Sequence, residues 1–311
     1  MLNSLRNRLI LAFLLLIGFL VAAHITSFSL NSKRIDLQQL RTNISEIKNL
    51  VLKNYISYQE FYTHDANNSR LHSTKEQPSL GQHYNLSNQI SQSIQKLQSN
   101  KVTQSSTVDE MLNKFEKDYQ HHNNLFDSLV TAIETKSSIN EKIEGEGSCT
   151  HRLLNDFHSW VNHEMVISLV HHEMNFILTK DSSYEHKIKE IVFGITSDIE
   201  KDPKIPTDIK DSLSTILETY SSSFNELVYY EREVIGTDMK SGLRAELHES
   251  FQTLDNTLTR IENEAIQQQE ILIQNLDIWY KVFIIGAILI GIFVALYNSR
   301  RVSKTLGVLS D

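Results

Sequence analysis

Four residues with charged or polar side chains lie on helical stripes that are otherwise apolar: Glu164, His171, Glu231 and Arg244. A buried charge is costly unless it is paired, so side chains of this kind on an inward helix face need a partner. In one interpretation they pair with one another, Arg244 with Glu164 or Glu231, and His171 donates to either carboxylate. In the other they line a pocket in which Arg244 binds a carboxylate through two parallel hydrogen bonds. Arg244 also falls in the first turn of its predicted helix, where backbone N–H groups attract an anion, so it is our first candidate for ligand binding.

A second group of polar residues lies in the N-terminal half of the chain. Asn54, His122 and Lys136 occupy apolar stripes, and the face beside the first of these stripes carries Arg41, Lys48, Tyr55 and Tyr62. Basic residues at such positions are usually solvated, and a tyrosine there is usually a core residue with a polar tip. The alternative is a second anion site between the first and third helices. Its candidate residues are Arg41, Lys48, Tyr55 and His122.

Metal and enzyme chemistry have little support in the residues. The chain contains 13 histidines, but His121 and His122 are adjacent, as are His171 and His172, and adjacent side chains diverge on a helix. The sequence contains no glycine-rich phosphate loop, nucleophile elbow or paired-cysteine motif. The formal net charge of −8 disfavours nucleic acid as a partner. We expect no metal, no cofactor and no catalytic residue in this chain.

Apolar residues recur at alternating spacings of three and four along seven segments, which predicts an all-α fold of packed helices. The sequence has 10 Gly and 3 Pro among 311 residues, which leaves few ways to build hairpins. The stripes are Leu37, Leu40, Ile44, Ile47, Val51, Asn54, Tyr58 and Phe61; Leu86, Ile90, Ile94 and Leu97; Val108, Leu112, Phe115, Tyr119, His122, Phe126, Leu129, Ile133, Lys136 and Ile143; Leu153, Phe157, Trp160, Glu164, Ile167, His171, Met174 and Leu178; Ile188, Ile191 and Ile195; Leu213, Leu217, Tyr220, Phe224, Leu227, Glu231 and Val234; and Arg244, Leu247, Phe251, Leu254, Leu258, Ile261, Ala265 and Leu272.

The order of long and short helices repeats along the chain. A helix that ends in Phe is followed by a turn containing Asp, a short helix, a longer helix and a junction containing Gly. The paired helix ends are Phe61 with Asp65 and Phe176 with Asp181. This repeat predicts two four-helix modules in tandem. Seven helical segments are joined by six junctions. If both ends of this region return to the same membrane, the chain reverses direction an odd number of times, so at least one junction has to run on roughly straight. We expect one long helix to do so near Gly145.

Two long apolar segments, residues 9–30 and 278–297, enclose the predicted helices of residues 31–277. Each is long enough to cross a bilayer as a helix. Basic residues precede the first segment, in the N-terminal stretch 1–8, and follow the second: Arg6, Arg8, Arg300, Arg301 and Lys304. Both chain ends are therefore expected in the cytoplasm, with residues 31–277 outside.

The first apolar segment has a rival interpretation as a cleaved signal peptide. Val21, Ala22 and Ala23 offer small residues after an apolar stretch of suitable length. Apolar character resumes at Ile25 and Phe28, which favours an uncleaved anchor.

Two stretches resemble the signature stretches of helical bimodular sensor domains: HHEMNFILTKDSSY at 171–184 and SGLRAELHESF at 241–251. Such domains lie outside the membrane in bacterial chemoreceptors and sensor histidine kinases. The resemblance covers roughly residues 31–277, and it implies two stacked four-helix bundles that bind small organic acids or partner proteins. Met174 and Asn175 stand where the family usually has a charged pair after His-Glu. Residues 298–311 resemble the start of a HAMP signalling linker, although the proline usual in its first helix is replaced near Thr305.

The resemblance and the two apolar segments together imply a homodimeric receptor in a bacterial inner membrane. Its periplasmic segment is expected to sense a small anionic ligand, in particular an organic acid, and to signal through the second span. The alternative is a docking module that senses a periplasmic solute-binding protein. A kinase, cyclase or methyl-accepting output domain is expected in a longer protein, so this chain itself is not expected to be an enzyme.

Overall fold

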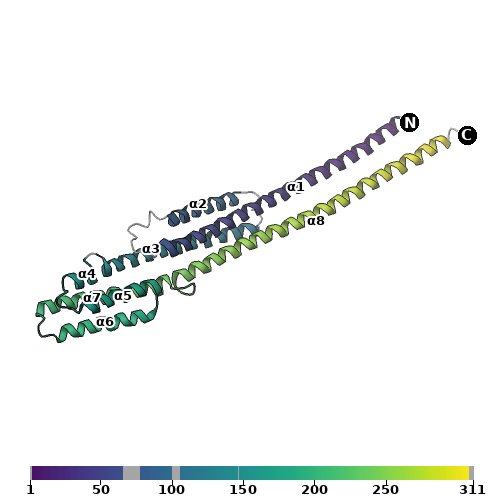
Figure 1. Cartoon of the computed structure of the whole chain (residues 1–311). Coiled ribbons are helices and arrows are strands. Elements are labelled where there is room, and N and C mark those ends of the chain that lie inside the picture. Colours follow the sequence, from purple (N-terminus) through teal and green to yellow (C-terminus); the bar gives the residue numbers. More distant parts are fainter. Residues whose placement is uncertain (1, 66–77, 100–105, 146, 308–311) are drawn as a thin grey trace. The chain divides into compact units, whose positions relative to one another are not determined.

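The protein is all-helical in its computed structural model, which describes residues 2–65, 78–99, 106–145 and 147–307 (Figure 1). No strand occurs among these described residues, which confirms the predicted all-α fold class. The elements are α1 (Leu2–Glu60), the π-helical η1 (Phe61–Asp65), α2 (Pro78–Gln98), α3 (Ser106–Glu144), α4 (Cys149–Asn155), α5 (His163–Thr179), α6 (Ser182–Lys201), α7 (Thr207–Tyr229), the π-helical η4 (Tyr230–Ile235) and α8 (Gly242–Gly307).

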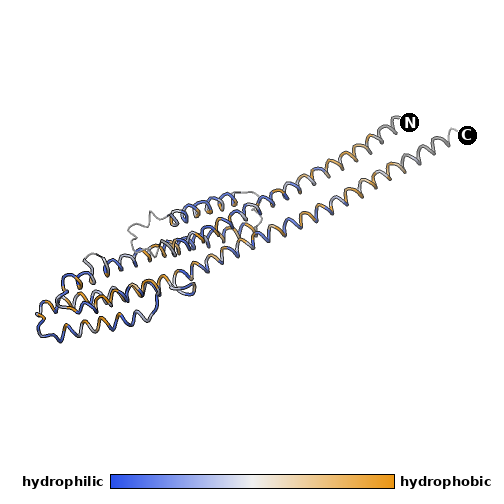
Figure 2. Tube along the Cα trace, viewed as in Figure 1, coloured by the Kyte–Doolittle hydropathy of each residue, from blue (hydrophilic) through white to orange (hydrophobic). Residues whose placement is uncertain are grey.

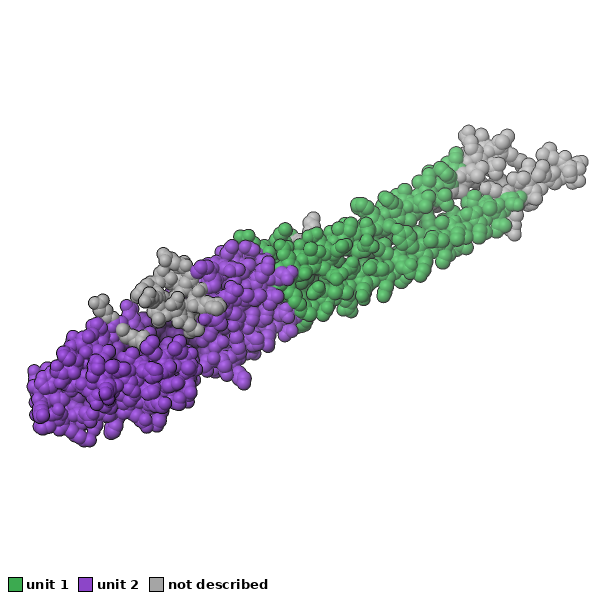
Figure 3. All heavy atoms as spheres, in the orientation of Figure 1, with its two compact units in different colours: residues 1–48, 92–113, 257–311 green, residues 49–91, 114–256 purple. Residues whose placement is uncertain are grey.

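The chain divides into two compact units, each built from segments that are distant in the sequence (Figure 3). Unit 1 contains Met1–Lys48, Gln92–Asn113 and Thr257–Asp311, and unit 2 contains Asn49–Ser91 and Lys114–Asn256. Helices α4 to α7 belong wholly to unit 2. The segment Lys114–Asn256 of unit 2 also contains Glu164, His171, Glu231 and Arg244.

Unit 2 has two hydrophobic clusters in its interior. One gathers buried residues from the end of α3 and from α4 to α7, among them Phe176 and Tyr220. The other gathers residues from the end of α1, from α3 and from the start of α8, among them Tyr58, Phe126 and Leu247. These residues lie on the predicted stripes of α1, α3, α7 and α8, except Phe176. Burial of each large side chain contributes about 1.5–3 kcal/mol, so the stripes account for much of the driving force for packing.

The helix predicted over residues 153–178 is interrupted in the structure. α4 ends at Asn155, and α5 begins at His163 after the N-cap residue Asn162, whose side chain accepts hydrogen bonds from two backbone N–H groups. The buried residues of α5 are Val166, Leu169, Glu173 and Phe176. The predicted stripe was therefore wrong over α5, and several of its members are exposed: Trp160, Ile167, Met174 and Leu178. The non-helical turn between α4 and α5 changes which positions of α5 face the core. A heptad pattern continued across this turn therefore selects exposed residues.

Helix α3 does not pass through the region near Gly145, where one long helix was expected. It ends at Glu144, and Gly145 N–H donates to Glu141 O at 2.8 Å. The next helix, α4, begins at Cys149 after Ser148, whose hydroxyl accepts a hydrogen bond from the backbone at His151. The N-cap fixes a new helix start at this point.

In unit 1, α1 and α8 pack against each other along their apolar parts. The rings of Phe19 and Phe283 meet edge to face, with centroids 5.4 Å apart. A Cβ atom at Gly286 would lie 2.6 Å from Phe19 Cζ, so glycine permits this close approach. The hydroxyls of Ser27 and Tyr280 lie 3.2 Å apart and share a hydrogen bond.

Helix α8 contains, within Gly242–Leu296, a stretch that is long and apolar enough to cross a membrane by length and composition. None of this stretch is buried, and Figure 2 shows apolar turns recurring along the C-terminal part of α8. A span in α1 was not found among the described residues, and several side chains of its first apolar segment lie outside them, so the first span stays a prediction. The predicted HAMP start continues α8 as far as Gly307, and residues 308–311 lie outside the described part.

Candidate functional site

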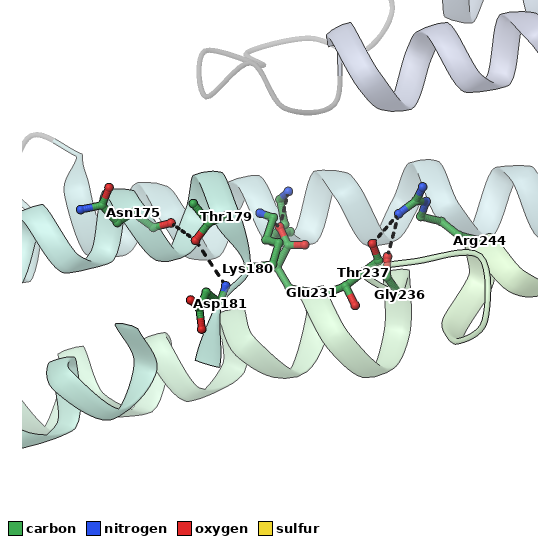
Figure 4. A network of polar contacts seen from close by, with 9 residues as sticks. Asn175, Thr179, Lys180, Asp181, Glu231, Gly236, Thr237 and Arg244 are labelled. Atoms are coloured by element: carbon green, nitrogen blue, oxygen red, sulfur yellow. Dashed lines mark hydrogen bonds and ion pairs between the residues drawn. The ribbon is translucent and has the colours of Figure 1, made fainter. Parts of the chain in front are cut away.

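Glu231 is the centre of a buried polar network in unit 2 (Figure 4). It lies in η4, the π-helical turn that continues α7, and 1% of its surface is exposed. Its Oε1 accepts hydrogen bonds from Lys136 Nζ of α3 at 2.7 Å and from Lys180 Nζ at 2.6 Å. Its Oε2 is buried and makes no hydrogen bond among the described residues. Two cations therefore share one carboxylate, which keeps one open acceptor.

The link between α5 and α6 fixes the position of Lys180. Lys180 has a left-handed backbone conformation with φ of 59°, and its N–H donates to Phe176 O at 2.7 Å to end α5. Asp181 then starts α6, because its carboxylate accepts a hydrogen bond from Ser183 N–H at 2.8 Å. Few residues other than glycine adopt this conformation. Here it lets α5 end within one residue and brings the ammonium group of Lys180 to Glu231.

Arg244 lies in the first turn of α8, as predicted, but its observed partners are backbone carbonyl groups and the tyrosines Tyr58 and Tyr62. Its Nη1 donates to Gly236 O at 3.3 Å and to Thr237 O at 3.0 Å (Figure 4). Its guanidinium carbon lies 4.0 Å from the centroid of the Tyr62 ring, a cation–π contact worth about 0.5–2 kcal/mol. Its Nε is buried and has no hydrogen-bond partner in the described part of the chain. Arg244 thus holds the turn before α8 and keeps one donor open.

We call five residues the cationic cluster: Tyr62, Lys136, Lys180, Glu231 and Arg244. Three of them are cations and one is an anion, so the cluster carries more positive than negative charge. Burial raises the pKa of Tyr62. The positive charge of Arg244 lowers this pKa and the negative charge of Glu231 raises it, so Tyr62 is within electrostatic reach of both residues. Burial also raises the pKa of Glu231, but the two lysines outweigh it and hold that pKa below its usual value. Burial lowers the pKa of Lys180 despite the nearby carboxylate.

Two predicted members of the C-terminal site lie elsewhere. Glu164 is exposed in the first turn of α5, and His171 is exposed on the same helix, where Asn175 Nδ2 donates to its backbone carbonyl at 2.9 Å. Within the described part of the chain, neither residue forms a hydrogen bond or an ion pair with Arg244 or Glu231. The prediction that places them beside Arg244 is wrong, because the turn before α5 changes which face of the helix is buried.

Arg41 and Lys48, predicted for a second anion site, lie in unit 1 and face α8. Arg41 Nη1 donates to Gln269 Oε1 at 3.0 Å, and Lys48 Nζ donates to Thr259 Oγ1 at 2.8 Å. Both contacts join α1 to α8. The expected site between the first and third helices is not what these side chains form.

Tyr55 and His122, the other two candidates for that site, lie in unit 2 and also contact α8. The Tyr55 hydroxyl lies 2.8 Å from His248 Nδ1, and its ring stacks on Phe251 with centroids 4.0 Å apart. His122 Nδ1 lies 3.3 Å from Ser250 Oγ. Their role in the structure is to join α1 and α3 to the start of α8.

A second buried network in unit 2 surrounds Asn54. Its Nδ2 donates to His83 O at 2.9 Å and to Ser87 Oγ at 3.2 Å. The His83 ring stacks on Phe126 with centroids 3.5 Å apart. Burial, together with the charge that His122 would carry, lowers the pKa of His83 to about 3, and burial lowers the pKa of His122 to about 4. Both imidazoles are therefore neutral core groups at neutral pH.

The sequence gives no sign of the role of Lys180, which falls in the predicted turn between Phe176 and Asp181. Its role depends on a left-handed backbone and on a carboxylate distant in the chain, and neither feature leaves a local signal. No group of three or more His, Cys, Asp or Glu residues that could hold a metal ion occurs in the described ranges.

Comparisons with known proteins give no match: no family model, curated protein or solved structure matches the chain.

Proposed function

We propose that the chain is a membrane-anchored sensor and that unit 2 binds a small organic anion at the cationic cluster. The observation that carries this proposal is the charge of the cluster: Lys136 and Lys180 share the single carboxylate of Glu231, and the charges of Arg244 and Glu231 both act on Tyr62. An uncompensated cation away from water costs several kcal/mol, so an added anion is stabilised there. The excess of cations is notable in a chain whose formal net charge is −8.

The open polar atoms indicate which groups the ligand carries. Arg244 Nε is a buried donor without a partner among the described residues, and a carboxylate oxygen satisfies it. Glu231 Oε2 is a buried acceptor in the same situation, and a hydroxyl or ammonium group satisfies it. A small carboxylate with a neighbouring hydroxyl or amino group can form hydrogen bonds with both Arg244 Nε and Glu231 Oε2.

In this proposal a signal passes from the cluster toward the membrane through consecutive segments of the chain. η4 carries Glu231, the turn held by Arg244 follows, and α8 then runs toward the apolar stretch. An anion bound by Arg244 competes with Gly236 O and Thr237 O for its donors. The ligand would therefore favour a different geometry of this turn, since it shifts states only by binding them unequally.

The architecture that fits this role has two stacked four-helix modules outside the inner membrane of a bacterium, with a span on each side and a HAMP linker after the second. The apolar stretch in α8 and the basic residues after it support the second span. The apolar segment of residues 9–30 and its basic flank support the first. Output domains of a kinase or chemoreceptor would follow, and the receptor would act as a homodimer.

The decisive experiment is calorimetry on the full chain in lipid nanodiscs, with acetate, succinate, malate and aspartate as probes. We expect saturable binding of malate or aspartate, weakened about tenfold or more by Lys180→Met, because the cluster loses one of its three positive charges. Lys187→Met, which removes an exposed lysine of α6, is the matched control and should bind as the wild type does. Absence of binding by all four probes, or equal binding by the Lys180→Met variant, would overturn the proposal.

A docking module for a solute-binding protein is the second candidate, and one observation favours it. Ile167, Met174 and Leu178 lie along one exposed face of α5, with 51%, 53% and 77% of their surface exposed. Apolar residues gathered on one face are typical of a protein contact. Titration of the full chain with purified periplasmic solute-binding proteins, repeated with Leu178→Glu, separates this function from direct anion binding.

A further inference from the structure

A pocket lies between α1 and α8 in unit 1, where the two apolar segments pack together. Its volume is about 340 Å³, which is within the range of sites that bind small organic molecules. Both helices line it, α1 between Phe19 and Leu30 and α8 between Leu276 and Ala287. The cationic cluster belongs to unit 2, so this pocket is a separate site.

Aromatic rings make up much of the lining. Phe19, Trp279, Tyr280 and Phe283 carry a phenyl, phenol or indole ring. The rings of Trp279 and Phe283 have centroids 5.7 Å apart and planes tilted by 30°. Trp279 and Tyr280 have 46% and 56% of their surface exposed, so a ligand can reach their rings. Aromatic rings pair with other planar rings in stacked or edge-to-face geometry, which a flexible acyl chain cannot adopt. The lining therefore favours a ligand with a planar conjugated ring.

Three polar side chains line the same pocket: His24, Ser27 and Tyr280. The hydroxyls of Ser27 and Tyr280 lie 3.2 Å apart and share one hydrogen bond, which uses the proton of one hydroxyl and leaves the other proton to donate elsewhere. The neutral imidazole of His24 adds one N–H donor. An ionisable residue within a membrane span is rare and often marks a functional site. The pocket thus offers two donors to a ligand that carries two acceptor atoms.

The pocket offers no counter-charge to an ionic ligand. None of the described residues that line it is Asp, Glu, Lys or Arg. Asp277 and Lys281 occupy the same part of α8 but pair with each other, with Lys281 Nζ 2.6 Å from Asp277 Oδ2. A phospholipid headgroup or a fatty-acid carboxylate would therefore bury its charge here without a partner, which is unfavourable. The ligand that fits is uncharged.

We propose that this pocket binds a membrane-soluble quinone. Its planar ring would lie against Trp279 and Phe283, and its apolar tail would extend into the lipid. One carbonyl oxygen would accept a hydrogen bond from His24, and the other would accept the remaining hydroxyl proton of Ser27 and Tyr280. The inference rests on the proposed membrane anchoring and goes beyond the proposed function, because it adds a second, uncharged ligand that contacts both spans.

Tryptophan fluorescence of the full chain in lipid nanodiscs tests this site, because the sequence has 2 Trp. Trp160→Phe leaves Trp279 in the pocket as the reporter, and Trp279→Phe leaves Trp160, in the turn between α4 and α5, as the control. The probes are a decyl benzoquinone and a phytyl naphthoquinone, both with fully substituted rings that cannot add to the Cys149 thiol. We expect at least one of them to quench Trp279 saturably against the excess of phospholipid, whereas Trp160 shows no saturable quenching. Quenching of Trp279 that rises linearly with both probes would overturn the inference.

Variants made in the Trp160→Phe background tie the binding to the polar lining. His24→Leu removes one donor, and we expect the half-saturating quinone concentration to rise about tenfold. Thr26→Val is the matched control, because the Thr26 hydroxyl donates to Ala22 O at 2.9 Å within its own helix and does not line the pocket. This variant should bind as its parent does. Equal affinities of His24→Leu and Thr26→Val would contradict the assigned contact.

A steric pair of variants tests the location independently of hydrogen bonding. Ala23→Phe places a ring in the pocket and should abolish saturable quenching, whereas Ala22→Phe, at the neighbouring position outside the lining, should not. Unchanged binding by Ala23→Phe would remove the quinone from this pocket. Co-elution of the chain with the nanodiscs reads membrane anchoring separately, and calorimetry with organic anions reads the cationic cluster, so a failure of either assumption is recognised as such.

Discussion

Lys180 Nζ lies 2.6 Å from Glu231 Oε1, although the two residues are 51 positions apart in the chain. The lysine ends α5 and the glutamate sits in the π-helical turn after α7. A π-helical turn is uncommon and often occurs at functional sites. This ion pair therefore joins the left-handed end of α5 to the π-helical η4. The turn that leads into α8 follows η4 directly.

Removal of the Glu231 charge should destabilise unit 2 strongly. In Glu231→Gln the ammonium groups of Lys136 and Lys180 lose their shared counter-charge, and breaking a buried pair in this way costs about 3–5 kcal/mol. The measurement is the free energy of unfolding by urea at pH 7. Glu190→Gln is the matched control, because Glu190 pairs with His186 on an exposed face, and we expect a change within about 0.5 kcal/mol. Equal effects of the two substitutions would mean that the Glu231 pairs contribute little.

The Glu231 carboxylate should also make the stability of the protein depend on pH in the acid range. Its pKa in the folded protein lies below the ordinary value of 4.5, so its contribution to stability is present above about pH 4.5 and is lost as the pH falls through the folded value. In the Glu231→Gln variant this acid-dependent loss should be smaller than in the wild type. The measurement is the urea midpoint between pH 5 and pH 3.

His83 and His122 should make the protein less stable at mildly acid pH. Their pKa values are lowered from 6.5 to about 3 and about 4, so the unfolded chain binds protons more readily than the folded one below pH 6.5. Stability should therefore fall by roughly 2–4 kcal/mol between pH 7 and pH 5. His122→Gln should remove about half of this slope, whereas His158→Gln, at an exposed position, should leave it unchanged. An identical slope in His122→Gln would show that this histidine does not contribute.

The burial pattern of α1 could be predicted from the sequence because the helix is uninterrupted from Leu37 to Glu60, and Phe61 follows as the first residue of η1. Every predicted member of that stripe is buried, including Asn54. When the helical period is constant, a prediction of burial has only to identify the buried face, and the apolar residues identify it.

The face of α5 and the partners of Arg244 could not be predicted in the same way. A turn between α4 and α5 resets the helical phase, and no Gly or Pro marks it between Asn155 and His163. The carbonyl groups that bind Arg244 belong to a turn whose geometry depends on two glycines with positive φ, Gly236 and Gly242. Backbone partners carry no side-chain signal, so sequence reasoning favoured acids.

The corrected face of α5 predicts opposite outcomes for two neighbouring apolar residues. Phe176 is fully buried and packs edge to face with Phe224, so Phe176→Ala should cost about 3–5 kcal/mol. Leu178 has 77% of its surface exposed, and Leu178→Ala should change the stability by about 0.5 kcal/mol or less. Thermal unfolding of the two variants measures the difference. A greater loss for Leu178→Ala would return α5 to the face that the sequence stripe indicated.

The turn between η4 and α8 should tolerate no side chain at Gly236. This residue has φ of 89°, and a Cβ atom there would lie 1.9 Å from Ser241 O, so backbone must move. Gly147 is the matched control, because it has φ of 78° but no atom within 4 Å of an added Cβ. Gly147→Ala should cost about 1–3 kcal/mol for backbone strain alone, and Gly236→Ala should cost clearly more. If the turn also transmits the signal, Gly236→Ala should weaken malate or aspartate binding, since Gly236 O is one of the groups that positions Arg244. Equal stability of the two variants would show that the turn can open without loss, and Arg244 would then have no fixed anchor.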